Sequence, residues 1–330
     1  MKSAHKNTVF IVLLGITAAL IVGSAFLQLR VGVNAAKTSR IDPGKEYGRY
    51  VMLIAERIDS PFWQMVYAGA LEAAEELDCV VELSGPLSGA DRRSTDEYLD
   101  YAIAARVDGI LCYVHDDAQT RANLALAAKK GIPVVTLEND SVSSPRISFV
   151  GVSSWELGKL LGEQLVRTGG NSSRALVLTD GSAWKSSENI MLSGMREAVR
   201  QFSGISVVPL GSADFSGSGF EEAVRRRIME DMSLDVIVSL RVEDTMLAAQ
   251  SLIELNQTNR VSVVSFRESP EIYEYLRKGI VSAVVVVDAR QMGRRAIESL
   301  VEYLDTGHTN DYVITDMHVV NAENLGVYRE

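Results

Sequence analysis

Histidine and cysteine, the residue types most typical of acid–base and covalent catalysis, are sparse in this chain, and no evident nucleophile and base stand together. The four histidines, His5, His115, His308 and His318, are too scattered for a metal site or a Ser-His-Asp triad. The loop at 181–187 has some phosphate-loop residues but lacks the second glycine and the spacing. No G-x-S-x-G elbow occurs. We therefore expect a protein that is not an enzyme and that holds no metal and no cofactor.

Composition narrows the partners further. The 330 residues include 43 acidic and 33 basic side chains, a formal net charge of −10. An acidic surface repels phosphate backbones, so we expect no nucleic-acid partner. The two cysteines, Cys79 and Cys112, lie in strand-like stretches without a metal-binding spacing. In a doubly wound sheet their strands would flank the first strand on opposite sides, which predicts two free thiols.

Short apolar runs alternate with amphipathic segments over most of the chain. The first unit is a strand at Tyr50–Ala55, followed by Ser60 as an N-cap and Pro61 in the first helical turn. Further strands are predicted at Cys79–Leu83, Gly109–Val114, Ile132–Leu137, Phe149–Val152, Arg174–Thr179, Ile205–Leu210, Asp235–Leu240, Arg260–Phe266, Ser282–Val287 and Val313–Val320. This alternation predicts an α/β protein with parallel sheets covered by helices. Because ligands of such sheets bind beyond the carboxyl ends of the strands, the functional residues should follow the strands.

An unbroken apolar run at residues 9–29 precedes the α/β part. At about 1.5 Å per residue it spans about 30 Å, the thickness of a hydrocarbon core. Lys2 and Lys6 precede it, so the positive-inside rule leaves residues 1–8 in the cytoplasm. We predict a transmembrane signal anchor, then a linker at 30–46, with the globular part on the extracytoplasmic side of the cell membrane. A cleaved signal peptide is the alternative, because small residues follow the run.

Several short motifs occur in an order known from one protein family. They are Ser60-Pro61-Phe62-Trp63, Asp108-Gly109-Ile110, Lys130–Leu137, Ala213-Asp214-Phe215, Val264-Ser265-Phe266 with Ser269-Pro270, Gln291-Met292-Gly293 and Val319–Asn324. From about Tyr47 to the C-terminus the chain resembles the type I periplasmic binding proteins for sugars. The nearest type is the ribose-binding group, which serves ABC transporters and shares its fold with LacI-type repressors.

The resemblance implies two lobes, each a parallel sheet flanked by helices, joined by three crossings of the chain. The crossings would lie near 152–153, 287–288 and 316–318. The first lobe would hold residues 47–152 and 288–316, and the second 153–287 and 317–330. A small ligand, sugar or sugar-like and including an anionic one, would bind between the lobes and close them like a hinge. An ABC permease or a membrane sensor kinase would read the closed form.

The resemblance also implies ligand-binding residues. In the ribose type aromatic rings sandwich the sugar, and Phe62, Trp63 and Phe215 stand at those positions. Ser60 stands where the family usually has asparagine, and Glu138 and Asn139 stand where its hydroxyl-binding pair lies. Other positions depart from the family: Met191, Val242 and Val287 replace polar residues, and Arg267 replaces an aspartate. Each sugar hydroxyl left without a partner costs about 1–3 kcal/mol, so the usual way of holding a pyranose is weakened.

The aromatic candidates differ in their alternatives. The apolar stripe of the first helix is predicted to comprise Phe62, Met65, Val66, Gly69, Ala73 and Leu77. Phe62 begins that stripe and so has a core role as its alternative, whereas Trp63 lies off it and is the better ligand candidate. Trp184, in a polar loop, either lines the site or lies on the surface. Phe215 forms either a ligand wall or a loop contact.

Arg267 is the most informative charge. A cation at the carboxyl end of a strand, facing a site, is costly unless it is paired. Three interpretations stay open: it binds a carboxylate-bearing ligand, it pairs locally with Glu268, Glu243 or Asp244, or it meets Glu138 across the site and holds the lobes together without ligand.

The sequence thus favours a membrane-anchored extracytoplasmic solute-binding protein of the sugar-binding type, which closes on its ligand. The alternative is a degenerate binding-protein fold that acts as an interaction module and has no small-molecule ligand.

Overall fold

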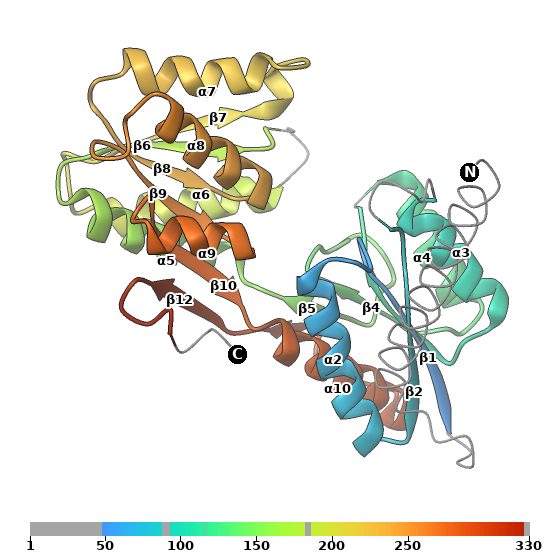
Figure 1. Cartoon of the computed structure of the whole chain (residues 1–330). Helices are drawn as coiled ribbons and strands as arrows, with labels where there is room; N and C mark the ends of the chain where they lie inside the picture. Colours follow the sequence, from blue (N-terminus) through green and yellow to red (C-terminus); the bar gives the residue numbers. More distant parts are fainter. Residues whose placement is uncertain (1–47, 88–92, 116, 182–185, 327–330) are drawn as a thin grey trace, which may run out of the picture. The chain divides into compact units, whose positions relative to one another are not determined.

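The apolar runs form two sheets of six strands each in the computed structural model (Figure 1). The first sheet has the spatial order β11 (Tyr312–Ile314), β5 (Ser148–Gly151), β4 (Val134–Leu137), β3 (Gly109–Tyr113), β1 (Arg49–Ile54) and β2 (Cys79–Ser84). All of its strand pairs are parallel. Its central strands are buried on both faces, as parallel strands between helical layers must be.

The second sheet repeats this order with later strands. It runs β12 (Met317–Asn321), β10 (Val281–Val287), β9 (Ser262–Phe266), β8 (Leu234–Ser239), β6 (Arg174–Thr179) and β7 (Ser206–Gly211). Every pair is parallel except that of β10 and β12, which is antiparallel. β4 and β9 therefore occupy equivalent positions in the two sheets, as do β5 and β10.

Helices cover both faces of each sheet. The first sheet has α2 (Pro61–Glu76) and α10 (Ala289–Thr306) on one face and α3 (Thr95–Ala105) and α4 (Ala118–Lys129) on the other. The second has α5 (Ser154–Gly169) and α6 (Ser186–Val199) on one face and α7 (Gly219–Glu230), α8 (Val242–Glu254) and α9 (Pro270–Arg277) on the other (Figure 1). We call the first sheet with its helices the first lobe and the second with its helices the second lobe.

Close helix pairs are possible because glycines lie at the crossings. A Cβ at Gly69 of α2 would lie 1.8 Å from the Arg290 carbonyl oxygen of α10. A Cβ at Gly158 of α5 would lie 2.0 Å from the Met191 carbonyl oxygen of α6. Both helix pairs pack backbone against backbone, so in each lobe a glycine allows two helices to approach closely.

Three short segments connect the sheets. They are residues 152–153 between β5 and α5, Asp288 between β10 and α10, and residues 315–316 between β11 and β12. Gln291 ties two of them together, because its side chain donates to Asp316 Oδ2 at 2.7 Å and accepts from the Asp316 N–H at 2.8 Å. The Asp288 N–H also donates to the Asp316 carbonyl oxygen at 2.9 Å.

Two expectations about elements need correction. The single last strand at Val313–Val320 is wrong, because β11 and β12 belong to different sheets and the chain crosses between them. The apolar stripe of α2 is rotated: Met65 is 44% exposed, whereas Trp63 and Ala70 are buried. The cysteines behave as the strand order predicts, since β2 and β3 flank β1 and both thiols are free and buried.

The structure describes residues 48–326, apart from 88–92, 116 and 182–185. The predicted segments 1–8, 9–29 and 30–46 and the candidate Trp184 lie outside the described residues. Among the described residues, no helix combines the length and the apolar character that crossing a membrane requires.

Candidate functional site

Four aromatic rings stand next to one another at the carboxyl edge of the first sheet. Phe62 and Trp63 begin α2, and Tyr113 ends β3. The rings of Phe62 and Trp63 meet edge to face with centroids 5.4 Å apart, and those of Trp63 and Tyr113 with centroids 5.9 Å apart. His115 continues the series at 5.1 Å from Tyr113. Such T-shaped pairs stabilise a fixed arrangement of rings.

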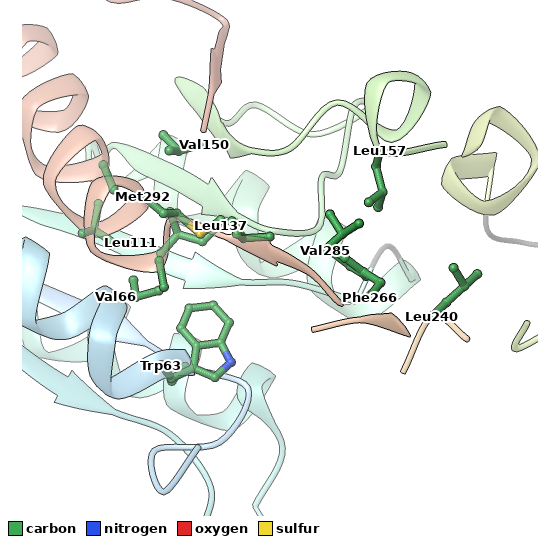
Figure 2. Close-up of a cluster of buried hydrophobic side chains, with 14 of the residues drawn as sticks. Trp63, Val66, Leu111, Leu137, Val150, Leu157, Leu240, Phe266, Val285 and Met292 are labelled. Atoms are coloured by element: carbon green, nitrogen blue, oxygen red, sulfur yellow. The ribbon is translucent and has the colours of Figure 1, made fainter. Parts of the chain in front are cut away.

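The two aromatic candidates on α2 differ in burial in the opposite way from the prediction. Trp63 is 1% exposed and lies with Val66 and Leu111 in the core of the first lobe (Figure 2). Phe62 is half-buried and only packs against that core. The expectation that Phe62 begins the buried stripe and that Trp63 lies off it is therefore corrected: Trp63 is the buried ring, and the more exposed ring of Phe62 meets it edge to face.

The loop after β4 is held in one conformation. Glu138 has a φ of 65°, and its N–H donates to the Val150 carbonyl oxygen of β5 at 3.0 Å. The Asn139 side-chain amide donates to the Tyr113 hydroxyl at 3.0 Å. Asp140 forms an ion pair with Arg146, with 2.7 Å between Oδ2 and Nη2. Glu138 and Asn139 are thus fixed beside the aromatic rings.

Arg267 follows β9 and is held in the same way. Its φ is 75°, and its N–H donates to the Val285 carbonyl oxygen of β10 at 2.9 Å. Beneath it three buried hydroxyls form a chain: Ser239 to Thr245 at 2.7 Å, Thr245 to Ser265 at 2.8 Å. The Ser265 hydroxyl donates to the Arg267 carbonyl oxygen at 3.3 Å, so the second lobe fixes this backbone from both sides.

The Arg267 side chain reaches the first lobe. Its Nη2 donates to Glu138 Oε1, and its Cζ lies 4.6 Å from the centroid of the Phe62 ring. The same Cζ lies 4.9 Å from the centroid of the Phe266 ring. The side chains of Arg267 and Glu138 are 21% and 19% exposed. Of the three interpretations of Arg267, the structure has the one in which it meets Glu138.

Burial shifts the titration of the groups around this ion pair. It raises the pKa of the Tyr113 hydroxyl, and the nearby Glu56 and Glu138 carboxylates raise that pKa further. Burial also raises the pKa of Glu138; Arg267 opposes this effect, and Glu56 adds to it. The pKa of Glu268 is raised by its own burial. Of these carboxylates, that of Glu138 contacts the Arg267 guanidinium.

The carboxyl edge of the second sheet carries a separate polar cluster. Arg241, after β8, donates from Nε to Asp244 Oδ2 at 2.8 Å and from Nη2 to Asp244 Oδ1 at 2.9 Å. The same Nη2 lies 3.4 Å from the Ser212 hydroxyl, which itself donates to the carbonyl oxygen of Asp180. Asp244, expected as one local partner of Arg267, is thus bound to Arg241.

The remaining candidate residues lie away from the contact between Arg267 and Glu138. Phe215 packs against Phe220 of its own lobe, with centroids 6.0 Å apart. Ser60 is the N-cap residue of α2, but its side chain makes no capping hydrogen bond. Met191 and Val287, which replace polar residues of the family, are buried in the core. Val242 is the first residue of α8 and packs against the core of the second lobe.

Sequence reasoning missed Tyr113 and Arg241. Both had an available signal: Tyr113 is the last residue of its strand and Arg241 comes two residues after its strand, where the ligands of parallel sheets bind. With Phe62, Glu138, Asn139 and Arg267, the site offers an aromatic face, a carboxylate, an amide and a guanidinium. Such a set can hold a small polar molecule with an apolar face.

Comparison with known proteins agrees with the fold. Residues 51–309 match the family model described as the periplasmic binding protein domain. No curated protein matches the sequence.

Solved structures, among them two sugar-binding proteins, are similar over nearly their whole length. GanP, a glucose-galactose binding protein from Geobacillus stearothermophilus, is 26% identical, with a TM-score of 0.75 over 85% of this chain and 99% of that one. XylFII in its complex with LytSN is 27% identical, with a TM-score of 0.68 over 83% of this chain and 98% of that one. AraP, an arabinose binding protein from the same Geobacillus species, is 18% identical with a TM-score of 0.76 over 86% and 99%, and shares the fold. The chain therefore belongs to the periplasmic binding protein family and has its two-lobed type I fold.

Proposed function

We propose that this chain is an extracytoplasmic solute-binding protein of the sugar-binding type, without catalytic activity. Its two lobes close on a small polyhydroxylated ligand, and the closed form is presented to a membrane partner. The ligand binds the closed form better than the open one and so shifts the population toward it. The apolar run at residues 9–29 anchors the chain in the membrane with the lobes outside.

The observation that carries the proposal is the cluster at the carboxyl edges of the sheets. Phe62 offers a ring for the apolar face of a sugar, and Glu138 and Asn139 offer hydrogen-bonding groups beside it. Residues from three separate segments of the first lobe converge there, at the edge where ligands of parallel sheets bind. The likeness to GanP, a glucose-galactose binding protein, supports the same class of ligand.

For the partner we favour a sensor kinase over an ABC permease. XylFII was solved in a complex with LytSN, and its likeness to this chain supports a sensor-type partner. A permanent membrane anchor suits a stationary sensor, whereas a shuttle between membrane sites needs a free protein. Co-purification of the full chain with the sensor kinase from its own membrane, in the presence and absence of sugar, tests this choice.

A thermal-shift screen of the full chain in detergent tests the ligand class. Neutral pentoses and hexoses, polyols and sugar acids are compared at equal concentration, and we expect a neutral sugar to raise the melting temperature. Phe62→Ala should abolish that rise because the stacking ring is lost. The matched control is Phe202→Ala, a half-buried phenylalanine after α6, which should keep the rise.

The competing function is an interaction module without a small-molecule ligand. The buried Met191 and Val287 favour it, since they offer no hydrogen bonds where the family's ligand finds them. A screen in which no sugar, polyol or sugar acid stabilises the chain would leave this module as the better description.

A further inference from the structure

The residues of the ion pair occupy equivalent places in the two lobes. Glu138 is the first residue after β4 and Arg267 the first after β9, and these strands hold the same position in their sheets. Both have positive φ, 65° and 75°, in the left-handed region that side chains other than glycine rarely adopt. Both donate their N–H to the neighbouring strand, at Val150 and Val285. The two lobes thus place opposite charges on matching, sterically costly turns, a feature typical of functional positions.

The guanidinium of Arg267 interacts with the first lobe in the way a bound molecule would. One of its edges donates to Glu138, and one of its faces lies against the Phe62 ring. A sugar makes the same two kinds of contact, because its hydroxyls donate to carboxylates and its C–H face stacks on an aromatic ring. Arg267 therefore takes the place where the first lobe would bind a sugar.

We propose that Arg267 is a built-in ligand of the first lobe, which holds the two lobes together in the absence of solute. The pair is mostly buried, so it is screened less by salt than a surface ion pair. Its cation–π contact with Phe62 adds a second interaction between the lobes. A solute that binds Phe62 or Glu138 has to displace Arg267; this consequence rests on the proposed function, whereas the latch itself does not.

The charges around the pair indicate what kind of solute displaces it. Glu56 acts on both Tyr113 and Glu138, and Glu268 is the neighbour of Arg267 in the chain. A carboxylate-bearing solute that displaces Arg267 would bring a second negative charge against the Glu138 carboxylate, which Arg267 contacts in the structure. A neutral polyol replaces the donors that Glu138 loses and brings no further negative charge. The place therefore favours neutral sugars over sugar acids.

Energy transfer between fluorescent labels on the full chain tests the latch without any sugar. Val142, in the loop after β4, is 71% exposed, and Ala213, after β7, is also exposed. Val142→Cys and Ala213→Cys provide label sites at the two carboxyl edges, and the native cysteines are buried. We expect Arg267→Ala to lower the transfer efficiency because the edges move apart. Arg277→Ala is the matched control, since Arg277 pairs with Glu274 inside one helix, and it should leave the efficiency unchanged.

Two further variants keep the test decisive if Arg267→Ala folds poorly. Glu138→Gln keeps the shape and removes the charge, and it should also lower the efficiency. The charge exchange Glu138→Arg with Arg267→Glu should restore it. An efficiency equal to that of the parent protein in both Arg267→Ala and Glu138→Gln would overturn the latch. A failed sugar screen would leave this result untouched, so the two proposals fail separately.

Discussion

The two lobes contribute different kinds of side chain to the candidate site. In the first lobe, Phe62, Trp63 and Tyr113 form a continuous set of edge-to-face rings, and Glu138 stands beside them. In the second lobe the matching edge carries Arg241, held by two hydrogen bonds to Asp244, while the ring of Phe215 packs within its own lobe. One half is an aromatic platform, and the other is a set of charges that are already paired.

This difference shows that two sheets with the same strand order can carry different side chains at their carboxyl edges. Both sheets have the same strand order and both use glycines to bring two helices together. The side chains after the strands are not bound by that repetition, because loops at the carboxyl edge can change without disturbing the core. The first lobe therefore carries the aromatic face of the candidate site, and the second lobe supplies the cation, Arg267, that contacts it.

Trp63→Ala tests whether the aromatic platform rests on the core. Trp63 is 1% exposed, so its removal leaves a large cavity, and we expect the free energy of unfolding to fall by about 3–5 kcal/mol. Trp155→Ala, at a tryptophan that is 38% exposed, should cost less than about 1 kcal/mol. Urea unfolding measures both, and equal losses would mean that Trp63 is not a core residue.

Substituting the glycines at the helix crossings tests whether both lobes depend on close helix packing. Gly69→Ala in the first lobe and Gly158→Ala in the second each place a methyl group against a backbone carbonyl of the partner helix. Each should cost about 1–3 kcal/mol, because the helix pair has to move apart. At Gly219 the nearest atom would be 3.4 Å away, an ordinary contact, so Gly219→Ala should change stability little. A large loss in only one lobe would break the symmetry.

Arg241→Ala tests whether the charge pair of the second lobe is structural. It would leave the nearly buried Asp244 carboxylate, 4% exposed, without its two hydrogen bonds. We expect a loss of about 1–3 kcal/mol in the free energy of unfolding. Arg277→Ala removes an exposed pair and should cost no more than about 1 kcal/mol. Similar small losses in both would instead mark Arg241 as available to a ligand.

The pH dependence of stability separates the Glu138 carboxyl from an ordinary one. Its pKa is raised by burial, so the folded protein binds this proton more tightly than the unfolded chain does. Its contribution to the free energy of unfolding therefore falls as the pH rises from the ordinary glutamate value of 4.5 through the raised value, by about 1.4 kcal/mol for each pKa unit at most. The difference between wild type and Glu138→Gln, followed by urea unfolding, isolates it.

Glu76 supplies the control of opposite sign. Hydrogen bonding to Arg294 lowers the pKa of Glu76, so its contribution is lost as the pH falls through the lowered value. The wild-type minus Glu76→Gln difference should therefore rise with pH. Equal signs for the two variants would contradict the assignment of burial at Glu138.

Much of the architecture follows from local pattern. Runs such as Val51–Ile54 are apolar throughout, which only a strand covered on both faces requires, and Ser60 with Pro61 begins α2 as the residue types predict. The alternation of such runs with helices is sufficient for parallel sheets. The resemblance to the sugar-binding family, rather than local pattern, led to Glu138, Asn139 and Arg267 as candidates.

Helical spacing alone did not decide which face of α2 is buried. It favoured Phe62 and Met65, but the close approach of α10 at Gly69 turns the helix so that Trp63 and Ala70 face inward. Similarly, the run at 313–320 read as one strand, because nothing local marks the point where the chain leaves one sheet for the other.

The sequence by itself determined the alternation of strands and helices and the strand-like setting of the two cysteines, since these depend on neighbours along the chain. Only the tertiary structure decided which charge Arg267 meets. Four carboxylates of the chain were compatible with the sequence, Glu138, Glu243, Asp244 and Glu268, and in the structure Asp244 binds Arg241 instead. Glu138 lies 129 positions away in sequence, and a pairing at that distance depends on how two separately folded sheets bring their edges together.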